Sequence, residues 1–183
     1  MASWHKQFEN QLNELQKVDP AYRTFGSEYH HYKLKPTAPE SLVLQVEEKF
    51  NCRLPNDYRN YVLGFSDGGA GPGVGLISLE KAVELTEFGC EFPFEKSVDF
   101  MDDLENNFNY DDIFNGSLLL AHHGCSMYSF LVVRATTNCP QVWHGGEDFI
   151  EPQFASFSQW VLQWVGTALT DIRKTRNTAG NAG

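Results

Sequence analysis

Apolar side chains recur every three to four residues in four parts of the chain, and this spacing predicts four helices. The first helix covers residues 3–15, and the second covers residues 37–51. The third opens at Leu54 and stops at a run of glycines that begins with Gly68. The fourth covers residues 156–165.

Capping boxes support two of these helix starts. Thr37 is followed three residues later by Glu40, and Ser156 is followed in the same way by Gln159. We therefore expect the second helix to begin at Thr37 and the last helix to begin at Ser156.

Three short apolar runs predict β-strands in the second half of the chain. They cover residues 117–122, 127–134 and 141–144, and in the last run Val142 and Trp143 point to opposite faces. The gaps between the runs are short, which favours antiparallel pairing. The predicted fold class is therefore α+β, a single domain with a mostly antiparallel β-sheet flanked by helices and with an extra N-terminal helix.

Four weaker segments complete this prediction. One short strand is expected within residues 29–34, and another over residues 74–79. Residues 80–85 favour a short helical turn, and residues 86–115 form a long acidic excursion.

Five glycines lie between Gly68 and Gly75. A phosphate-binding loop has a strand before its glycines and a helix after them. Here the predicted order is helix, glycines, strand, and no Lys-Ser or Lys-Thr pair follows. We therefore expect a structural turn, with a helix C-cap at Gly68 or Gly69.

The charge of the chain excludes one class of partner. The 183 residues include 24 acids and 14 lysines and arginines, which gives a formal net charge of −10. Ten of the acids lie between Glu84 and Asp112, and Lys96 is the one basic residue among them. Such a surface repels nucleic acid and attracts cations or basic proteins. We therefore expect no direct binding of nucleic acid.

The sequence also predicts a compartment. No run approaches ~18 consecutive apolar residues, so we expect no contact with a membrane. The N-terminus lacks the basic and then apolar pattern of a signal peptide, so we expect a cytoplasmic protein. The four widely spaced cysteines are expected to be free thiols, mostly buried.

Histidines and cysteines gather in the predicted strand region and raise the question of metal or nucleophilic chemistry. They are His122, His123, Cys125, Cys139 and His144. Their spacing matches no familiar zinc motif, and adjacent strand residues point to opposite faces. Nothing basic surrounds Cys125 to activate its thiol. We therefore predict no catalytic residue, no metal and no cofactor. A zinc-dependent enzyme is the least favoured of the functions considered for this chain.

Aromatic residues alternate with acids in the acidic excursion. They are Phe92, Phe94, Phe100 and Phe108. One interpretation makes them core residues that hold down a long loop. The other makes them anchors of an interaction surface, because buried aromatics supply affinity while charge steers encounter.

Two segments of the chain resemble a known family. The first is LPNDYRNYVLGFSDGGAGPGVGLISLE, and the second comprises HHGCSMYSFLVV, QVWHG and FASFSQWVLQW. They are similar to the signature of the SUKH superfamily, which also includes fungal regulators of cell-wall glucan synthesis. Its Leu-Pro, acid and aromatic positions correspond to Leu54, Pro55, Asp57 and Tyr58.

The resemblance implies an α+β domain over residues 37–170, after an extension over residues 1–36 and before a polar tail over residues 171–183. It also implies a non-enzymatic bacterial immunity protein, which binds and blocks a cognate protein toxin, often a nuclease. The family has no shared catalytic residues. The main alternative is an intracellular regulator or scaffold that binds another basic partner.

Charge and resemblance together predict the contact surface. Toxins that act on nucleic acid need basic surfaces, so their inhibitor is expected to be acidic there. The predicted contacts with a basic nuclease are Glu84, Glu87, Glu91, Asp99, Asp102, Asp103, Asp111, Asp112, Glu147 and Asp148.

Overall fold

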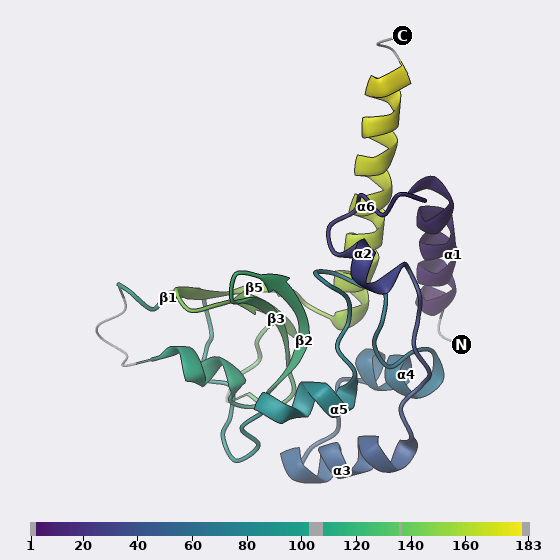
Figure 1. Ribbon diagram of the computed structural model, residues 1–183. Helices are drawn as coiled ribbons and strands as arrows, with labels where there is room; N and C mark the ends of the chain where they lie inside the picture. The colour runs from purple at the N-terminus through teal and green to yellow at the C-terminus, as the bar shows by residue number, and fades with distance from the viewer. Residues whose placement is uncertain (1–2, 103–107, 136, 181–183) are drawn as a thin grey trace.

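The computed structural model describes residues 3–102, 108–135 and 137–180 (Figure 1). Its helices are α1 (Ser3–Val18), α2 (Ser27–His30), α3 (Glu40–Phe50), α4 (Asn56–Gly64), α5 (Leu79–Ala82) and α6 (Phe157–Gly180), with 3₁₀ turns η1 (Val83–Leu85) and η2 (Tyr110–Phe114). Its strands are β1 (Val98–Asp99), β2 (Ser117–Gly124), β3 (Met127–Val132), β4 (Val142–Gly145) and β5 (Phe149–Phe154).

The five strands form one antiparallel sheet in the order β1-β5-β4-β3-β2. The predicted α+β class, the antiparallel pairing, and the strands at 117–122, 127–134 and 141–144 are confirmed. β1 and β5 were not predicted. In β5, Pro152 argues against a strand from sequence, because proline cannot donate to a ladder. It is accommodated here because β1 pairs with Phe149 and Ile150 alone.

Each face of the sheet has its own hydrophobic core, and Val142 and Trp143 show the division. Both side chains are fully buried, but Val142 belongs to the first core with the helices. Trp143 belongs to the second core, where Phe92, Phe94 and Ile113 cover the other face. The alternation that the sequence predicted for this strand is therefore confirmed.

The N-terminal helix α1 lies beside the long C-terminal helix α6 (Figure 1). Phe8, Leu12 and Leu15 of α1 are buried in the first core, as the apolar spacing predicted. α6 continues to Gly180, so the predicted polar tail over residues 171–183 is helical as far as that residue. No helix of the described residues combines the length and the apolar character needed to cross a bilayer.

The predicted capping box at Thr37 is wrong, because α3 begins at Glu40 with Pro39 at its N-cap and no side-chain cap. A proline disfavours helical backbone in the residue before it, here Ala38, so the helix starts after the proline. The box at Ser156 is present in part, since its hydroxyl accepts the Gln159 N–H at 3.3 Å.

The strand predicted within residues 29–34 is also wrong. Ser27–His30 is helical, and His31 and Tyr32 both adopt left-handed backbone conformations. Two such residues in succession interrupt an extended chain. Leu34 forms one isolated bridge with Gly69.

The glycine stretch is a structural turn, although not the helix cap that we expected. α4 ends at Gly64, and Phe65 is its C-cap. Gly69 and Leu76 exchange two backbone hydrogen bonds of 3.0 and 2.7 Å, which fold the stretch back on itself. The strand predicted at 74–79 is reduced to isolated bridges, because Gly73 and Gly75 have positive φ angles.

The predicted helical turn at residues 80–85 is confirmed by α5 and η1. The four cysteines are free, but the prediction that they are mostly buried is wrong. Cys90 and Cys125 are exposed, and Cys52 and Cys139 are half-buried.

Candidate functional site

The predicted acidic contacts separate into two groups in the structure. Six of them lie around the end of the sheet that carries β1 and η2, away from α1 and α6 (Figure 1). We call these six the acidic face: Asp99, Asp102, Asp111, Asp112, Glu147 and Asp148. Asp103 lies outside the described residues.

Backbone pairing assembles one side of the acidic face. The Phe100 N–H donates to the Asp148 carbonyl at 2.8 Å, and Asp99 pairs with Phe149 across β1 and β5. The Asp102 N–H donates to the Asp99 carbonyl at 3.3 Å. Segments about fifty residues apart in the chain therefore present their carboxylates together.

Tyr110 joins η2 to the same surface. Its pKa is raised to about 12, first by burial, then by Tyr128, and also by the negative charges of Glu147 and Asp111. These two carboxylates therefore lie close enough to the Tyr110 ring for their fields to act on it. Asp112 completes a capping box with Asn109 at the start of η2.

The remaining predicted contacts lie elsewhere, and two of them have basic partners. Glu84 pairs with Lys81 at 2.6 Å, and Glu91 pairs with Arg134 at 3.0 Å. Glu87 is exposed next to Asn115, beyond the far end of η2. Within the described residues, by contrast, no lysine or arginine forms an ion pair with the acidic face. Together with Glu87, the acidic face thus carries the predicted contact charge that no lysine or arginine of the described residues neutralises.

The aromatic residues of the acidic excursion belong to the protein interior. Phe92 and Phe94 are fully buried, and Phe92 forms edge-to-face contacts with both Phe94 and Trp143. Phe100 and Phe108 are half-buried and pack against the same core. They hold the loop to the sheet and are not available as interface anchors.

The histidines of the strands form a pair and not a metal cluster. His123 and His144 lie with ring centroids 5.0 Å apart, while His122 stacks on Tyr128. Burial, together with the neighbouring His144 and His122, lowers the pKa of His123 to about 4. Among the described residues, no group of three or more histidine, cysteine or acidic side chains is placed to hold a metal.

His123 also contacts a serine, which is the arrangement that nucleophilic catalysis uses. Its Nε2 atom lies 2.8 Å from the Ser129 hydroxyl. Ser129 is fully buried, however, so its hydroxyl is closed to a substrate. The contact satisfies two polar groups of the interior and explains their burial.

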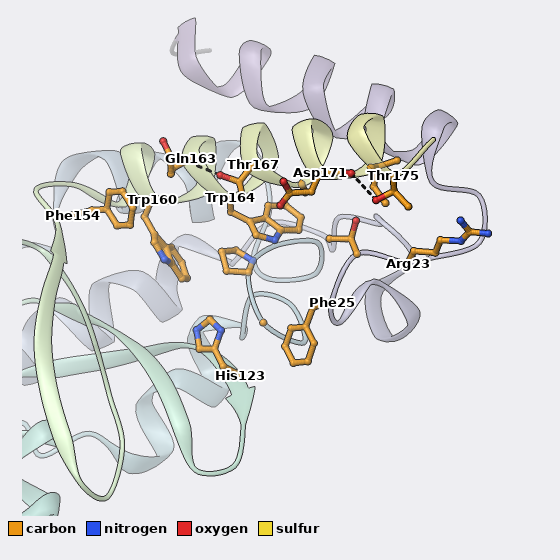
Figure 2. Close-up of a pocket in the computed structure, with 15 residues that line it drawn as sticks. Arg23, Phe25, His123, Phe154, Trp160, Gln163, Trp164, Thr167, Asp171 and Thr175 are labelled. Carbon is orange, nitrogen blue, oxygen red and sulfur yellow. Dashed lines mark hydrogen bonds between the residues drawn. The ribbon is translucent and has the colours of Figure 1, made fainter. Parts of the chain in front are cut away.

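A second concave surface, which the sequence did not reveal, lies along α6. It is a groove of about 670 Å³. Figure 2 shows Trp160 and Trp164 of α6 on one side, with His123 and Phe25 facing them. Pro72 and Gly73 of the glycine stretch also line it, and we call this surface the aromatic groove.

The loop between α1 and α2 supplies one wall of the aromatic groove, and Asp19 fixes this loop. The carboxylate of Asp19 accepts the N–H groups of Arg23 and Thr24, each at 2.9 Å. It also accepts the hydroxyl of Tyr32 at 2.5 Å. Phe25 follows directly and remains 60 % exposed.

No sequence signal identified the aromatic groove. Trp160 and Trp164 fit the apolar spacing of a helix that packs on the core, and Trp160 is 4 % exposed. Outside α6, the lining residues come from the segment 23–25, from Pro72 and Gly73, from His123 and from Phe154. Residues so far apart form a site through tertiary structure alone.

Comparison with known proteins places the fold in a family. The model of the "SMI1 / KNR4 family (SUKH-1)" matches residues 37–163. No curated protein matches the chain significantly. The matched stretch includes α3, α4, α5, every strand and the start of α6, and it agrees with the resemblance that the glycine and tryptophan motifs indicated. Because this stretch is well over half of the sequence, the chain belongs to the SMI1/KNR4 family (SUKH-1).

Proposed function

We propose that the chain is an immunity protein that binds and neutralises a cognate protein toxin. The observation that carries this proposal is the family match over residues 37–163. The family includes immunity proteins, and its members are in general not enzymes. Neutralisation then requires binding alone, without turnover of any substrate.

The toxin in this proposal is a basic protein, such as a nuclease, and it contacts the acidic face. Six carboxylates without a described basic partner create a negative potential at one end of the sheet. A nuclease needs a basic surface to hold its own substrate, so an acidic inhibitor complements that surface. The net charge of −10 adds a long-range attraction for the same basic partner.

Co-expression tests the proposal directly. The chain is produced in a bacterial host together with the toxin encoded next to its gene, and growth is compared with that of cells producing the toxin alone. We expect restored growth, a stable complex of the two purified proteins, and loss of the toxin's nuclease activity in that complex. A toxin that remains lethal and unbound in the presence of the chain contradicts the proposal. Binding to a basic protein that is not toxic favours the regulator or scaffold instead.

A further inference from the structure

We infer that the aromatic groove is the site that selects the toxin, and that it docks an apolar segment of the toxin flanked by a basic residue. This inference rests on the proposed function and names a second contact surface, distinct from the acidic face. The acidic face attracts any basic protein, whereas a shaped groove discriminates between them.

Exposed aromatic side chains are the first argument. Phe25 is 60 % exposed on the wall of the aromatic groove. Tyr22, in the same connection between α1 and α2, is 36 % exposed, and Tyr29, on α2, is 70 % exposed. These three are half of the large apolar side chains that the described part of the chain exposes. Aromatic residues are enriched in the cores of protein interfaces, where they supply much of the affinity.

The charges beside the groove define the class of segment that fits. Asp171 of α6 lines it, and the guanidinium of Arg23 is directed away from the two tryptophans (Figure 2). Asp171 also lies 3.6 Å from Lys174, but both side chains are exposed, and such pairs contribute little. An apolar wall beside the Asp171 carboxylate suits an apolar side chain next to a lysine or arginine.

The groove is built partly from segments that lie outside the family domain. Phe25 precedes the matched residues 37–163, and Trp164, Thr167 and Asp171 follow them. Other lining residues, among them Pro72, Gly73, His123 and Trp160, lie within the family domain. The aromatic groove therefore combines residues of the family domain with residues outside the matched stretch.

A protein partner fits this surface better than the other occupants. Phe25 on the wall of the aromatic groove is 60 % exposed, so a small ligand seated between the tryptophans would leave apolar surface uncovered. A second copy of the chain carries the same charge of −10, and like charges oppose self-association. Neither objection applies to a basic toxin, which is large enough to cover the apolar surface and opposite in charge.

Two pairs of variants test the inference with the purified toxin as the probe. Thr167→Arg places a long cation in the groove, and Thr170→Arg places the same cation on an exposed position of α6 outside the groove. Phe25→Ala removes the exposed ring, and Leu44→Ala removes a comparably exposed apolar side chain from α3. All four positions leave the buried cores unchanged, and circular dichroism checks that each variant is folded.

We expect Thr167→Arg and Phe25→Ala each to weaken toxin binding at least about tenfold in titration calorimetry, as for interface hot spots. Thr170→Arg and Leu44→Ala should bind as the unchanged chain does. If the unchanged chain binds toxin and all four variants bind equally well, the inference is overturned while the proposed function stands. If the unchanged chain binds no toxin, both are overturned. A dimer of the unchanged chain that Thr167→Arg dissociates assigns the groove to a second copy and overturns the inference as well.

Discussion

Asp57 on α4 accepts a hydrogen bond of 2.8 Å from the N–H of Ser158, 101 residues later in the chain. Ser158 lies in the first turn of α6, where N–H groups have no partner within the helix. The second oxygen of Asp57 accepts the N–H of Tyr58 at 2.9 Å. One carboxylate thus joins two helices of the family domain and places a negative charge at the positive end of α6.

Replacing Asp57 with alanine should therefore destabilise the protein. The loss of a helix cap costs about 1 kcal/mol, and the free energy of unfolding in urea measures it. Glu48→Ala is the matched control, because Glu48 is an exposed acid of α3 for which the structure shows no side-chain partner among the described residues. An equal effect of the two substitutions would mean that the Asp57 cap contributes nothing.

Asp57 also shows what the sequence could and could not predict. It was recognised as part of a family motif with Leu54, Pro55 and Tyr58, but its role as a cap for α6 depends on a contact across the fold. Apolar spacing predicted α1, α4 and α6 correctly, because each of these helices buries one stripe, and continuous apolar runs predicted β2, β3 and β4, which are buried largely on both faces. Both patterns are local properties of the sequence.

The errors lie where distant contacts or special backbone angles decide the structure. β5 includes a proline and a charged residue and becomes a strand because β4 and β1 flank it. The acidic face was predicted in part, since clustering of acids is visible in sequence whereas the ion pairs of Glu84 and Glu91 are not. The aromatic groove combines residues from Arg23 to Thr175 and follows no period.

Two glycines should respond in opposite directions to alanine. Gly69 has a φ of +95°, and a Cβ there would lie 2.4 Å from the carbonyl oxygen of Lys33. Gly69→Ala should therefore lower the free energy of unfolding by more than about 1 kcal/mol. Gly166 lies within α6 with open space around it, and Gly166→Ala should raise that free energy by up to about 1 kcal/mol. Thermal unfolding of both variants measures whether stability falls or rises. An unchanged stability of Gly69→Ala would contradict the role given to the glycine turn.

Thiol labelling should divide the cysteines into two classes. Cys90 and Cys125 are exposed, whereas Cys52 and Cys139 are half-buried and burial raises the pKa of both thiols. The reactive form is the thiolate, so Cys52 and Cys139 should be labelled more slowly. In a time course with a thiol reagent at neutral pH, two groups should react fast and two slowly. Four equal rates in the folded protein would contradict the exposures described here.

Asp19 should make stability depend on pH in the acidic range. Burial raises the pKa of its carboxyl, but the hydrogen bonds from Arg23, Tyr32 and Thr24 lower it by more, so the net pKa lies below the ordinary 3.8. A depressed pKa means that the charged form is favoured in the folded state. The stabilisation is therefore complete above the unfolded-state pKa and is lost as the pH falls through the lower, folded-state value.

Asp19→Asn tests this dependence. It should lower the free energy of unfolding by about 1–3 kcal/mol at pH 7, because hydrogen bonds to a charge are lost. The difference from the unchanged chain should stay constant down to about pH 5 and shrink below about pH 4. Tyr32→Phe removes one of the three donors and should have a smaller effect of the same sign. A difference that grows on acidification would contradict the direction of the pKa shift.

Charge reversal on the acidic face should slow encounter with the toxin. Asp111 and Glu147 are exposed on different segments of this face, so Asp111→Lys with Glu147→Lys inverts two local charges without disturbing a core. The association rate should fall about tenfold or more at low salt, since steering depends on local potential. The loss should fade as the Debye length shrinks from about 10 Å at 0.1 M to about 3 Å at 1 M salt.

The matched control for this experiment is Glu9→Lys with Glu48→Lys, which changes the net charge by the same amount on exposed positions of α1 and α3. Stopped-flow mixing with the purified toxin measures both double variants across the salt series. A control that slows association as much as the acidic-face variant would show that net charge alone attracts the toxin. The acidic face requires a larger effect from Asp111 and Glu147, because both carboxylates act on Tyr110 and so lie near one another, whereas Glu9 and Glu48 lie on separate helices.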